Sequence, residues 1–271
     1  MKKKLIIVAD DYGFSEAYNY GALKAYQEGV VTVLSLMSNM DAAEHAISLV
    51  RDMPNASIVQ HTNLVQGKPV SNPDSIPSLV NEQGMFYRSY LWKSEYDTNK
   101  NSRGIVSPTY EDCKIETLAQ LDRFKALTGS YPNHFEGHSV GTKAIQQAFR
   151  ELSEELHIHS VGLEEIESDE LYPVHELAMS VPSYREILHR GVCVEDFLED
   201  RFQLLTSPFE INALHFHPGY LDQYILDNTS LTIPRCKDLQ TLCDSRVKEW
   251  LNEHEIELTD YSVIYKKEMI Q

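Results

Sequence analysis

The chain has 271 residues, of which 42% are hydrophobic and 24% are charged. This composition is typical of a globular protein, and the length suits one barrel-sized domain. Lys and Arg total 24 against 41 Asp and Glu, which gives a formal net charge of −17. Such an acidic chain repels phosphate groups, so nucleic acid and anionic membrane surfaces are excluded as expected partners.

The cysteines and the N-terminus indicate a cytoplasmic protein. The four cysteines form no CxxC pair and are too few for a disulfide scaffold. They are Cys113, Cys193, Cys236 and Cys243. The apolar run after Lys2–Lys4 has only five residues before Asp10, which is too short for the hydrophobic region of a signal peptide. No apolar run approaches the length of a transmembrane helix.

The N-terminal quarter alternates between strand-like and helical patterns. Its first apolar run is short and β-branched, as in a strand that is buried on both faces. The segments follow the order strand, helix, strand, helix, strand: Leu5–Ala9, Glu16–Glu28, Val30–Met37, Ala42–Val50 and Ser57–Gln60. This order predicts parallel strands with right-handed crossovers, and therefore an α/β fold.

The pattern fades between residues 66 and 107, where proline and glycine interrupt the sequence repeatedly. The aromatic content of this stretch argues against disorder. We therefore expect a covering loop with short helices at 66–107.

The alternation resumes beyond this loop. We expect helices at Tyr110–Leu127, Thr142–Leu156 and Val247–Asn252. We expect strands at Pro132–His138, His157–Leu163, Ile211–Phe216 and Tyr261–Tyr265, with a solvated acidic stretch at 164–170. Because no internal repeat or linker is visible, we predict a single domain over residues 1–271.

Two adjacent carboxylates, Asp10 and Asp11, follow the first strand directly. Burying them is costly unless they are paired, protonated or bound to a cation. Active sites of barrels and open α/β sheets lie at this end of the strands. The structural alternative is that Asp10 caps the turn and Asp11 caps the next helix. Adjacent strand residues point to opposite faces, so a shared site requires the strand to end or twist between them.

Three histidines, His61, His138 and His217, also follow or end predicted strands. A single histidine in such a position is more often structural. In one parallel barrel, however, all three would converge with the two aspartates on the same rim. Two imidazoles and a carboxylate are a recurring ligand set for a catalytic divalent metal, and a further carboxylate and histidine suit a base and an acid.

The other eight histidines are weaker candidates. Five are interpreted as structural or surface residues: His45, His157, His159, His189 and His254. Three could donate hydrogen bonds behind the site: His134, His175 and His215.

Four ordered motifs resemble the YdjC-like carbohydrate deacetylase family. Residues Ala9–Ser15 (ADDYGFS) resemble the family's ADDFGLS, and Gln60–Val70 (QHTNLVQGKPV) resembles GLHLNLTEGKPV. Residues Pro132–His138 (PNHFEGH) resemble the start of PTHIDSHHHVH, and His217–Tyr220 (HPGY) resembles CHPGY. Residues Ile233–Arg235 stand where the family has a later PR element, so the resemblance spans nearly the whole chain.

The resemblance implies an irregular (β/α) barrel related to polysaccharide deacetylases, usually a homodimer, that removes acetyl groups from amino sugars or short chitooligosaccharide-type sugars. By position, it implies that Asp11, His61 and His138 bind the metal. It likewise implies that Asp10 is the general base and His217 the general acid. The family's usual ion is Mg²⁺, whereas these ligand types suit Zn²⁺ or another transition ion at least as well, because Mg²⁺ favours oxygen ligands.

The chain also departs from the family pattern. Residues 139–142 (SVGT) replace two further histidines, and Glu136 and Gly137 replace an aspartate and a serine. These changes alter the expected pocket wall, so the exact sugar is left open. Two alternatives also remain: a metal-dependent phosphohydrolase, which the lack of a glycine-rich phosphate cradle disfavours, and a catalytically silent sugar-binding barrel.

Overall fold

The computed structural model describes residues 2–92, 104–160, 172–177, 181 and 183–265. The strands are β1 Lys4–Tyr12, β2 Val33–Leu36, β3 Ile58–Thr62, β4 His134–Gly137, β5 His159–Ser160, β6 Val174–Glu176, β7 Ile211–Phe216 and β8 Glu257–Thr259. The helices are α1 Glu16–Glu28, α2 Ala43–Leu49, α3 Tyr110–Thr128, α4 Lys143–Leu156, α6 Tyr184–Arg190, α7 Val194–Leu198, α8 Gln223–Asn228, α9 Ile233–Leu242 and α10 Ser245–Glu253. Short 3₁₀ helices are η1 Pro73–Ser75, η2 Ser89–Leu91 and η3 Tyr261–Ile264.

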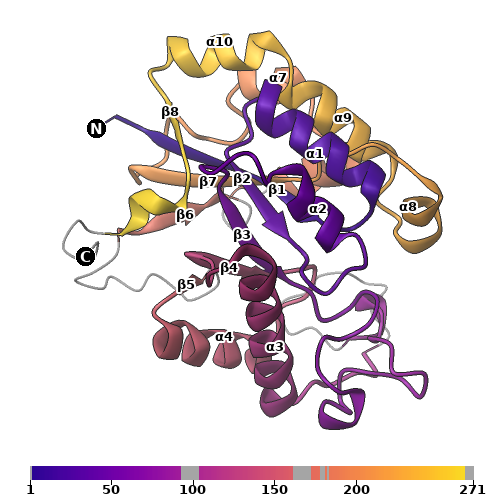
Figure 1. Cartoon of the computed structure of the whole chain (residues 1–271). Helices are drawn as coiled ribbons and strands as arrows, with labels where there is room; N and C mark the ends of the chain where they lie inside the picture. The colour runs from indigo at the N-terminus through magenta and orange to yellow at the C-terminus, as the bar shows by residue number, and fades with distance from the viewer. Residues whose placement is uncertain (1, 93–103, 161–171, 178–180, 182, 266–271) are drawn as a thin grey trace.

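The strands form one curled sheet in the order β5-β4-β3-β2-β1-β7-β6, and β8 pairs with the first half of β1. All pairings between these strands are parallel. Helices α1 and α2 lie against one side of the sheet, and α3 and α4 lie together near β3 and β4 (Figure 1). The prediction of an irregular α/β barrel is confirmed, in the form of a curled half-barrel.

Strand β1 is buried on both faces, as its apolar sequence predicts. Leu5, Ile7 and Ala9 pack with the helices in the main hydrophobic core. Ile6 and Val8 point to the concave face of the sheet, where they join a smaller apolar cluster. This alternation places the even-numbered residues of β1 inside the half-barrel.

The 3₁₀ helix η3 closes the apolar end of the concave face. Its Tyr261 and Ile264 are fully buried and pack with the inward side chains of β1, β2, β3 and β7. The prediction of a closing strand at Tyr261–Tyr265 is therefore wrong, and β8 is the last strand among the described residues. The Asp260 side chain accepts a hydrogen bond from the Ser262 backbone amide at 2.8 Å and so starts a helical turn there.

The other predicted elements differ mainly at their ends. Helix α1 has the predicted bounds, and Thr142 caps α4 rather than opening it. The predicted strand His157–Leu163 is seen as β5, while its residues 161–163 and the acidic stretch 164–170 lie outside the described residues. Strands β6 and β8 and helices α6 to α9 were not predicted.

The covering segment is tied to α3 by a buried carboxylate. Glu116 is fully buried and accepts hydrogen bonds from the amides of Val70 and Ser71, the Ser71 hydroxyl and the Gln120 side chain. The expected short helices are η1 and η2, and residues 93–103 of this segment lie outside the described part.

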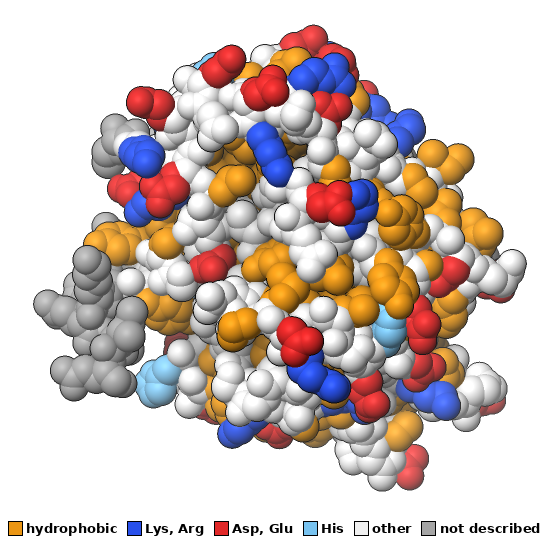
Figure 2. All heavy atoms as spheres, turned by 45° about the horizontal axis from the view of Figure 1, so that its top comes forward, with side chains coloured by type: hydrophobic (Ala, Val, Ile, Leu, Met, Phe, Trp, Pro, Cys, Tyr) orange, Lys and Arg blue, Asp and Glu red, His pale blue; other side chains and the backbone are white. Residues whose placement is uncertain are grey.

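The surface mixes charged and apolar side chains. Figure 2 shows Asp, Glu, Lys and Arg side chains interspersed with hydrophobic ones over one face. In the described part of the chain, no helix is both long enough and apolar enough to cross a bilayer.

Candidate functional site

The end of β1 turns so that both aspartates reach one region. Asp10 follows Ile6 and Val8 on the concave face, because alternate residues share a face. Asp11 has a φ of +62°, a left-handed conformation that is uncommon outside glycine but enriched in aspartate. The pairing register between β1 and β2 also shifts between Ala9 and Tyr12, as at a β-bulge. Because of this bend, Asp10 and Asp11 reach the same region although adjacent strand residues normally point to opposite faces.

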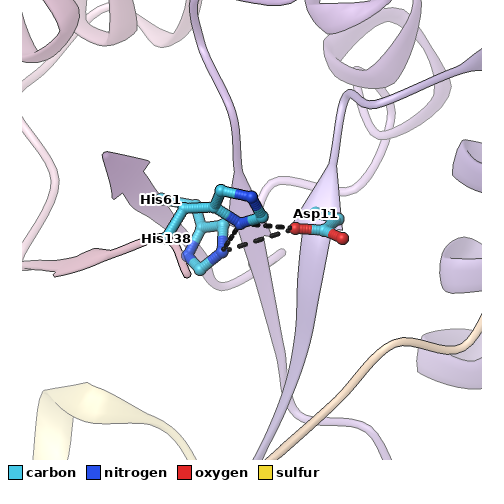
Figure 3. Close-up of side chains that lie close together, drawn as sticks. All are labelled: Asp11, His61 and His138. Atoms are coloured by element: carbon cyan, nitrogen blue, oxygen red, sulfur yellow. Dashed lines mark hydrogen bonds and ion pairs between the residues drawn. The ribbon is translucent and has the colours of Figure 1, made fainter. Parts of the chain in front are cut away.

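Asp11 lies against two histidines from neighbouring parts of the sheet (Figure 3). Its Oδ1 is 3.1 Å from Nδ1 of His138 and 3.5 Å from Nε2 of His61. The two ring nitrogens are 3.2 Å apart. Asp11 lies one residue before the end of β1, His61 lies in β3 and His138 follows β4, so the structure brings together the three residues predicted to bind metal.

These three donors fit a divalent ion. Ligand atoms about 2.0–2.1 Å from one ion are spaced by about 2.8–3.4 Å in octahedral or tetrahedral shells. Oδ1 of Asp11 is buried and receives no hydrogen bond in the described structure, so it keeps lone pairs for a cation. Two nitrogens and one oxygen suit a transition ion. Burial lowers the pKa of His61, but Asp10, Asp11 and Glu136 outweigh burial and raise it to about 10, so an arriving ion must displace a proton.

Arg235 holds the other oxygen of Asp11. The guanidinium is 2% exposed and donates to Oδ2 of Asp11 at 2.7 Å. It also donates to the Leu231 carbonyl and lies over the rings of Tyr18 and Phe14. Burial opposes ionisation of Asp11, but Arg235 and His138 hold the pKa of the carboxyl well below its usual range. The PR element in the sequence marked this arginine without indicating its role.

Asp10 belongs to a second group, with His215 and Glu136. Oδ1 of Asp10 is 3.1 Å from Nδ1 of His215, and Nε2 of His215 is 2.9 Å from Oε2 of Glu176. Burial raises the pKa of Asp10, and Glu136 adds to this while His215 and His61 oppose it. The sequence marked His215 only as a possible hydrogen-bond donor, and Glu176 was not recognised.

Glu136 connects the two groups. Its Oε1 accepts a hydrogen bond from the Ser35 hydroxyl and lies 3.3 Å from Nδ1 of His61. Its Oε2 is 3.5 Å from Nδ1 of His215 and 3.6 Å from Nε2 of His134. Burial would raise its pKa, yet the neighbouring imidazoles, His215 foremost, keep it well below its usual range. The signal available in the sequence was the alternation of β4, which puts His134 and Glu136 on one face.

His217 lies outside both groups of ligand atoms. Its backbone amide donates to Asp238 at 3.0 Å, and its Nδ1 is buried without a hydrogen-bond partner in the described structure. Burial lowers the pKa of His217 to about 3; nearby Asp11 opposes this shift and Arg235 reinforces it.

Helix α1 packs directly on the loop that carries His217. A Cβ on Gly21 would lie 2.6 Å from the Gly219 backbone, and one on Gly219 would overlap the Tyr18 ring. The Tyr18 hydroxyl in turn donates to the Asp10 carbonyl. Helix α1 therefore fixes the backbone of both predicted catalytic residues.

The remaining histidines mostly serve local structure. His134 and His159 share a hydrogen bond of 2.8 Å between their Nδ1 atoms, and His134 stacks on Tyr261. His175 bonds to Ser207 instead of facing the site. Of the three possible donors, His215 and His134 therefore border Glu136 and His175 does not.

Comparison with known proteins agrees with these motifs over most of the chain. The model of the family described as YdjC-like protein matches residues 4–253. The chain is 33% identical to "Carbohydrate deacetylase 2" of Listeria innocua, over 97% of this chain and 100% of that protein. It is 32% identical to "Chitooligosaccharide deacetylase" of Serratia marcescens, over 93% and 96%.

A solved structure has the same fold. The crystal structure of a putative cellobiose-phosphate cleavage protein from Enterococcus faecalis superposes with a TM-score of 0.80 at 21% identity, covering 98% of this chain and 100% of that one. With the family match over residues 4–253, these likenesses show that the chain belongs to the YdjC-like family.

Proposed function

We propose that this protein is a metal-dependent hydrolase that removes N-acetyl groups from amino sugars or short chitooligosaccharide-type sugars. The observation that carries the proposal is the cluster of Asp11, His61 and His138 beside the buried carboxyl of Asp10. The names of two full-length relatives, a carbohydrate deacetylase and a chitooligosaccharide deacetylase, support the substrate class.

Asp11, His61 and His138 would hold the ion. When bound, a divalent ion supplies Lewis-acid chemistry, which acidifies water and polarises the acetamide carbonyl. The mixed nitrogen and oxygen donors favour Zn²⁺ or another transition ion over Mg²⁺. Arg235 keeps Asp11 ionised and fixes its orientation.

Asp10 is the general base in this proposal. It takes a proton from the water whose oxygen attacks the acetamide carbon, and its raised pKa brings it closer to a neutral working range. His217 is the general acid in this proposal and delivers a proton to the nitrogen as the carbon–nitrogen bond breaks. Because burial lowers its pKa to about 3, His217 is neutral before the reaction and must gain that proton in its course. The products are acetate and the free amine of the sugar. Asp238 positions His217 through its backbone amide.

The proposal extends to assembly and location. We infer a homodimer from the family resemblance, and a cytoplasmic location from the absence of CxxC pairs and of a disulfide scaffold in the sequence. Light scattering coupled to gel filtration tests the dimer.

Acetate release tests the activity. Protein freed of metal and reloaded with Zn²⁺ or Mg²⁺ is incubated with N-acetylglucosamine and N,N′-diacetylchitobiose, and acetate and free amine are measured. Equal amounts of both products support the proposal. Phosphate release from sugar phosphates without acetate release would favour a phosphohydrolase. Sugar binding by metal-loaded protein without either product would indicate a silent barrel.

A further inference from the structure

A second set of ligand-type atoms lies beside the predicted metal centre. Nδ1 of His215 is 3.1 Å from Oδ1 of Asp10 and 3.5 Å from Oε2 of Glu136. One ligand atom from each of these residues lies within 4.8 Å of the others. These spacings resemble those of Asp11, His61 and His138, so both groups have the dimensions of a coordination shell.

One atom of this group points into it without a partner. Glu136 is 3% exposed, and its Oε2 receives no hydrogen bond within the described structure, although Oε1 accepts one from Ser35. A buried carboxylate oxygen without a donor is costly, and a cation satisfies it.

The outer contacts of His215 also match a metal ligand. Its Nε2 is 2.9 Å from Oε2 of Glu176, which leaves Nδ1 facing Asp10 and Glu136. A carboxylate behind a ligating imidazole fixes the tautomer that presents a lone pair to the ion. Glu176 would therefore orient His215 from behind without binding the ion itself.

The charge of the region favours more than one cation. Four carboxylates gather here: Asp10, Asp11, Glu136 and Glu176. In the described structure, Arg235 is the only Arg or Lys that pairs with any of them. With neutral imidazoles, Arg235 and one divalent ion neutralise three of the four negative charges.

We propose that Asp10, Glu136 and His215 form a second divalent-cation site, of lower affinity than the site at Asp11. Two oxygens and one nitrogen suit Zn²⁺, Mn²⁺ or Co²⁺. Occupancy of this site engages the Asp10 carboxylate. Excess metal therefore inhibits the enzyme, a consequence that rests on the proposed role of Asp10 as base.

Metal stoichiometry tests the site without reference to activity. Metal-free protein is dialysed against increasing Zn²⁺ at physiological ionic strength, and bound zinc is measured per chain. We expect two ions for the wild type, one tight and one weaker. His138→Gln should lose the tight ion, and His215→Gln should lose the weaker one.

Two further variants allow the test to be made even if His138→Gln or His215→Gln folds poorly. Glu176→Gln removes only the outer carboxylate and should weaken the second ion about 10–100-fold while the first is unchanged. His175→Gln is the matched control, because His175 lies in the same strand but bonds to Ser207. It should retain both ions. One ion in the wild type, or two in His215→Gln, overturns the proposal.

Activity separates this proposal from the proposed function. If deacetylation is observed, wild-type activity should rise and then fall as Zn²⁺ increases, and Glu176→Gln should shift the fall to about 10–100-fold higher Zn²⁺. Two bound ions without acetate release would support the second site and contradict the deacetylase assignment. Acetate release by protein that binds a single ion would support the deacetylase assignment and contradict the second site.

Discussion

Arg235 donates a hydrogen bond of 2.7 Å to Oδ2 of Asp11, although 224 positions separate the two residues in the chain. The pair is almost fully buried. Oδ1 faces His61 and His138, so the Asp11 carboxylate binds Arg235 through one oxygen and contributes the other to the candidate metal centre.

Replacing Arg235 should destabilise the metal-free protein more than the zinc-loaded protein. We expect Arg235→Met to cost about 3–5 kcal/mol of unfolding free energy, because it leaves the charge of Asp11 buried and less compensated. Added Zn²⁺ should recover part of the loss, giving a larger metal-induced rise in melting temperature than in the wild type. Lys237→Met, at an exposed position of α9, is the control. Equal metal-induced shifts in all three proteins would contradict the prediction.

The two aspartates should separate metal binding from turnover. Asp10→Asn should lower the rate of deacetylation about 10²–10⁴-fold, as expected for loss of a general base, while the tight ion remains. Zinc content and acetate release are measured on the same sample. Loss of the tight ion in Asp10→Asn would show that the roles of the aspartates are exchanged.

Asp11→Asn should instead lose the tight ion and keep the fold. Asparagine tolerates the left-handed backbone at this position, so the bend in β1 survives. Asp11→Ala adds a backbone cost of about 1–2 kcal/mol because alanine is strained there. Urea unfolding of both metal-free variants gives the difference. An alanine variant as stable as the asparagine variant would argue against backbone strain.

The covering segment should depend on Glu116. Glu116→Ala leaves the donors at Val70 and Ser71 without their acceptor, and we expect a loss of about 2–4 kcal/mol in urea unfolding. Proteolysis within residues 66–92 should accelerate as well. Glu111→Gln, exposed on the same helix, should change neither. Unaltered proteolysis in Glu116→Ala would mean that other contacts hold the segment.

His159 should make the free energy of unfolding depend on pH. Burial, with His134 adding, lowers its pKa to about 3 in the folded protein, against about 6.5 in an unfolded chain. The unfolded chain binds more protons between these values, so this contribution is present above pH 6.5 and is lost as the pH falls toward 3. His159→Asn should flatten the slope of unfolding free energy between pH 6.5 and 4, while the exposed His157→Asn should not. An unchanged slope in His159→Asn would contradict the assignment.

Local sequence patterns predicted the parts of the fold whose causes are local. The helix at Glu16–Glu28 ends at Gly29, as that residue type indicates. Its cap is Ser15 and not Asp11, which the structural alternative had placed there. The closing strand was misplaced because Tyr261 and Ile264 are apolar for another reason, namely to fill the end of the concave face.

The site was predictable only where a motif marked it. His61 and His138 stood out because they end or follow strands that meet at one rim. To predict Glu136 and His215 as site residues, one must know which faces of β4 and β7 point into the half-barrel. To predict Glu176, one must also recognise β6, whose three residues show no clear pattern. The bend at Asp11 depends on a φ angle that residue type alone does not fix.

The contact between α1 and the His217 loop depends on two glycines. Gly21 and Gly219 meet so closely that a side chain at either position would force the His217 loop away from α1. Arg88 also joins two parts of the chain: it donates to the Gln66 side chain within the covering segment and to the Asn228 carbonyl after α8, through hydrogen bonds that can be exchanged for water. We therefore expect the contact between Arg88 and Asn228 to open more readily than the contact between α1 and the His217 loop.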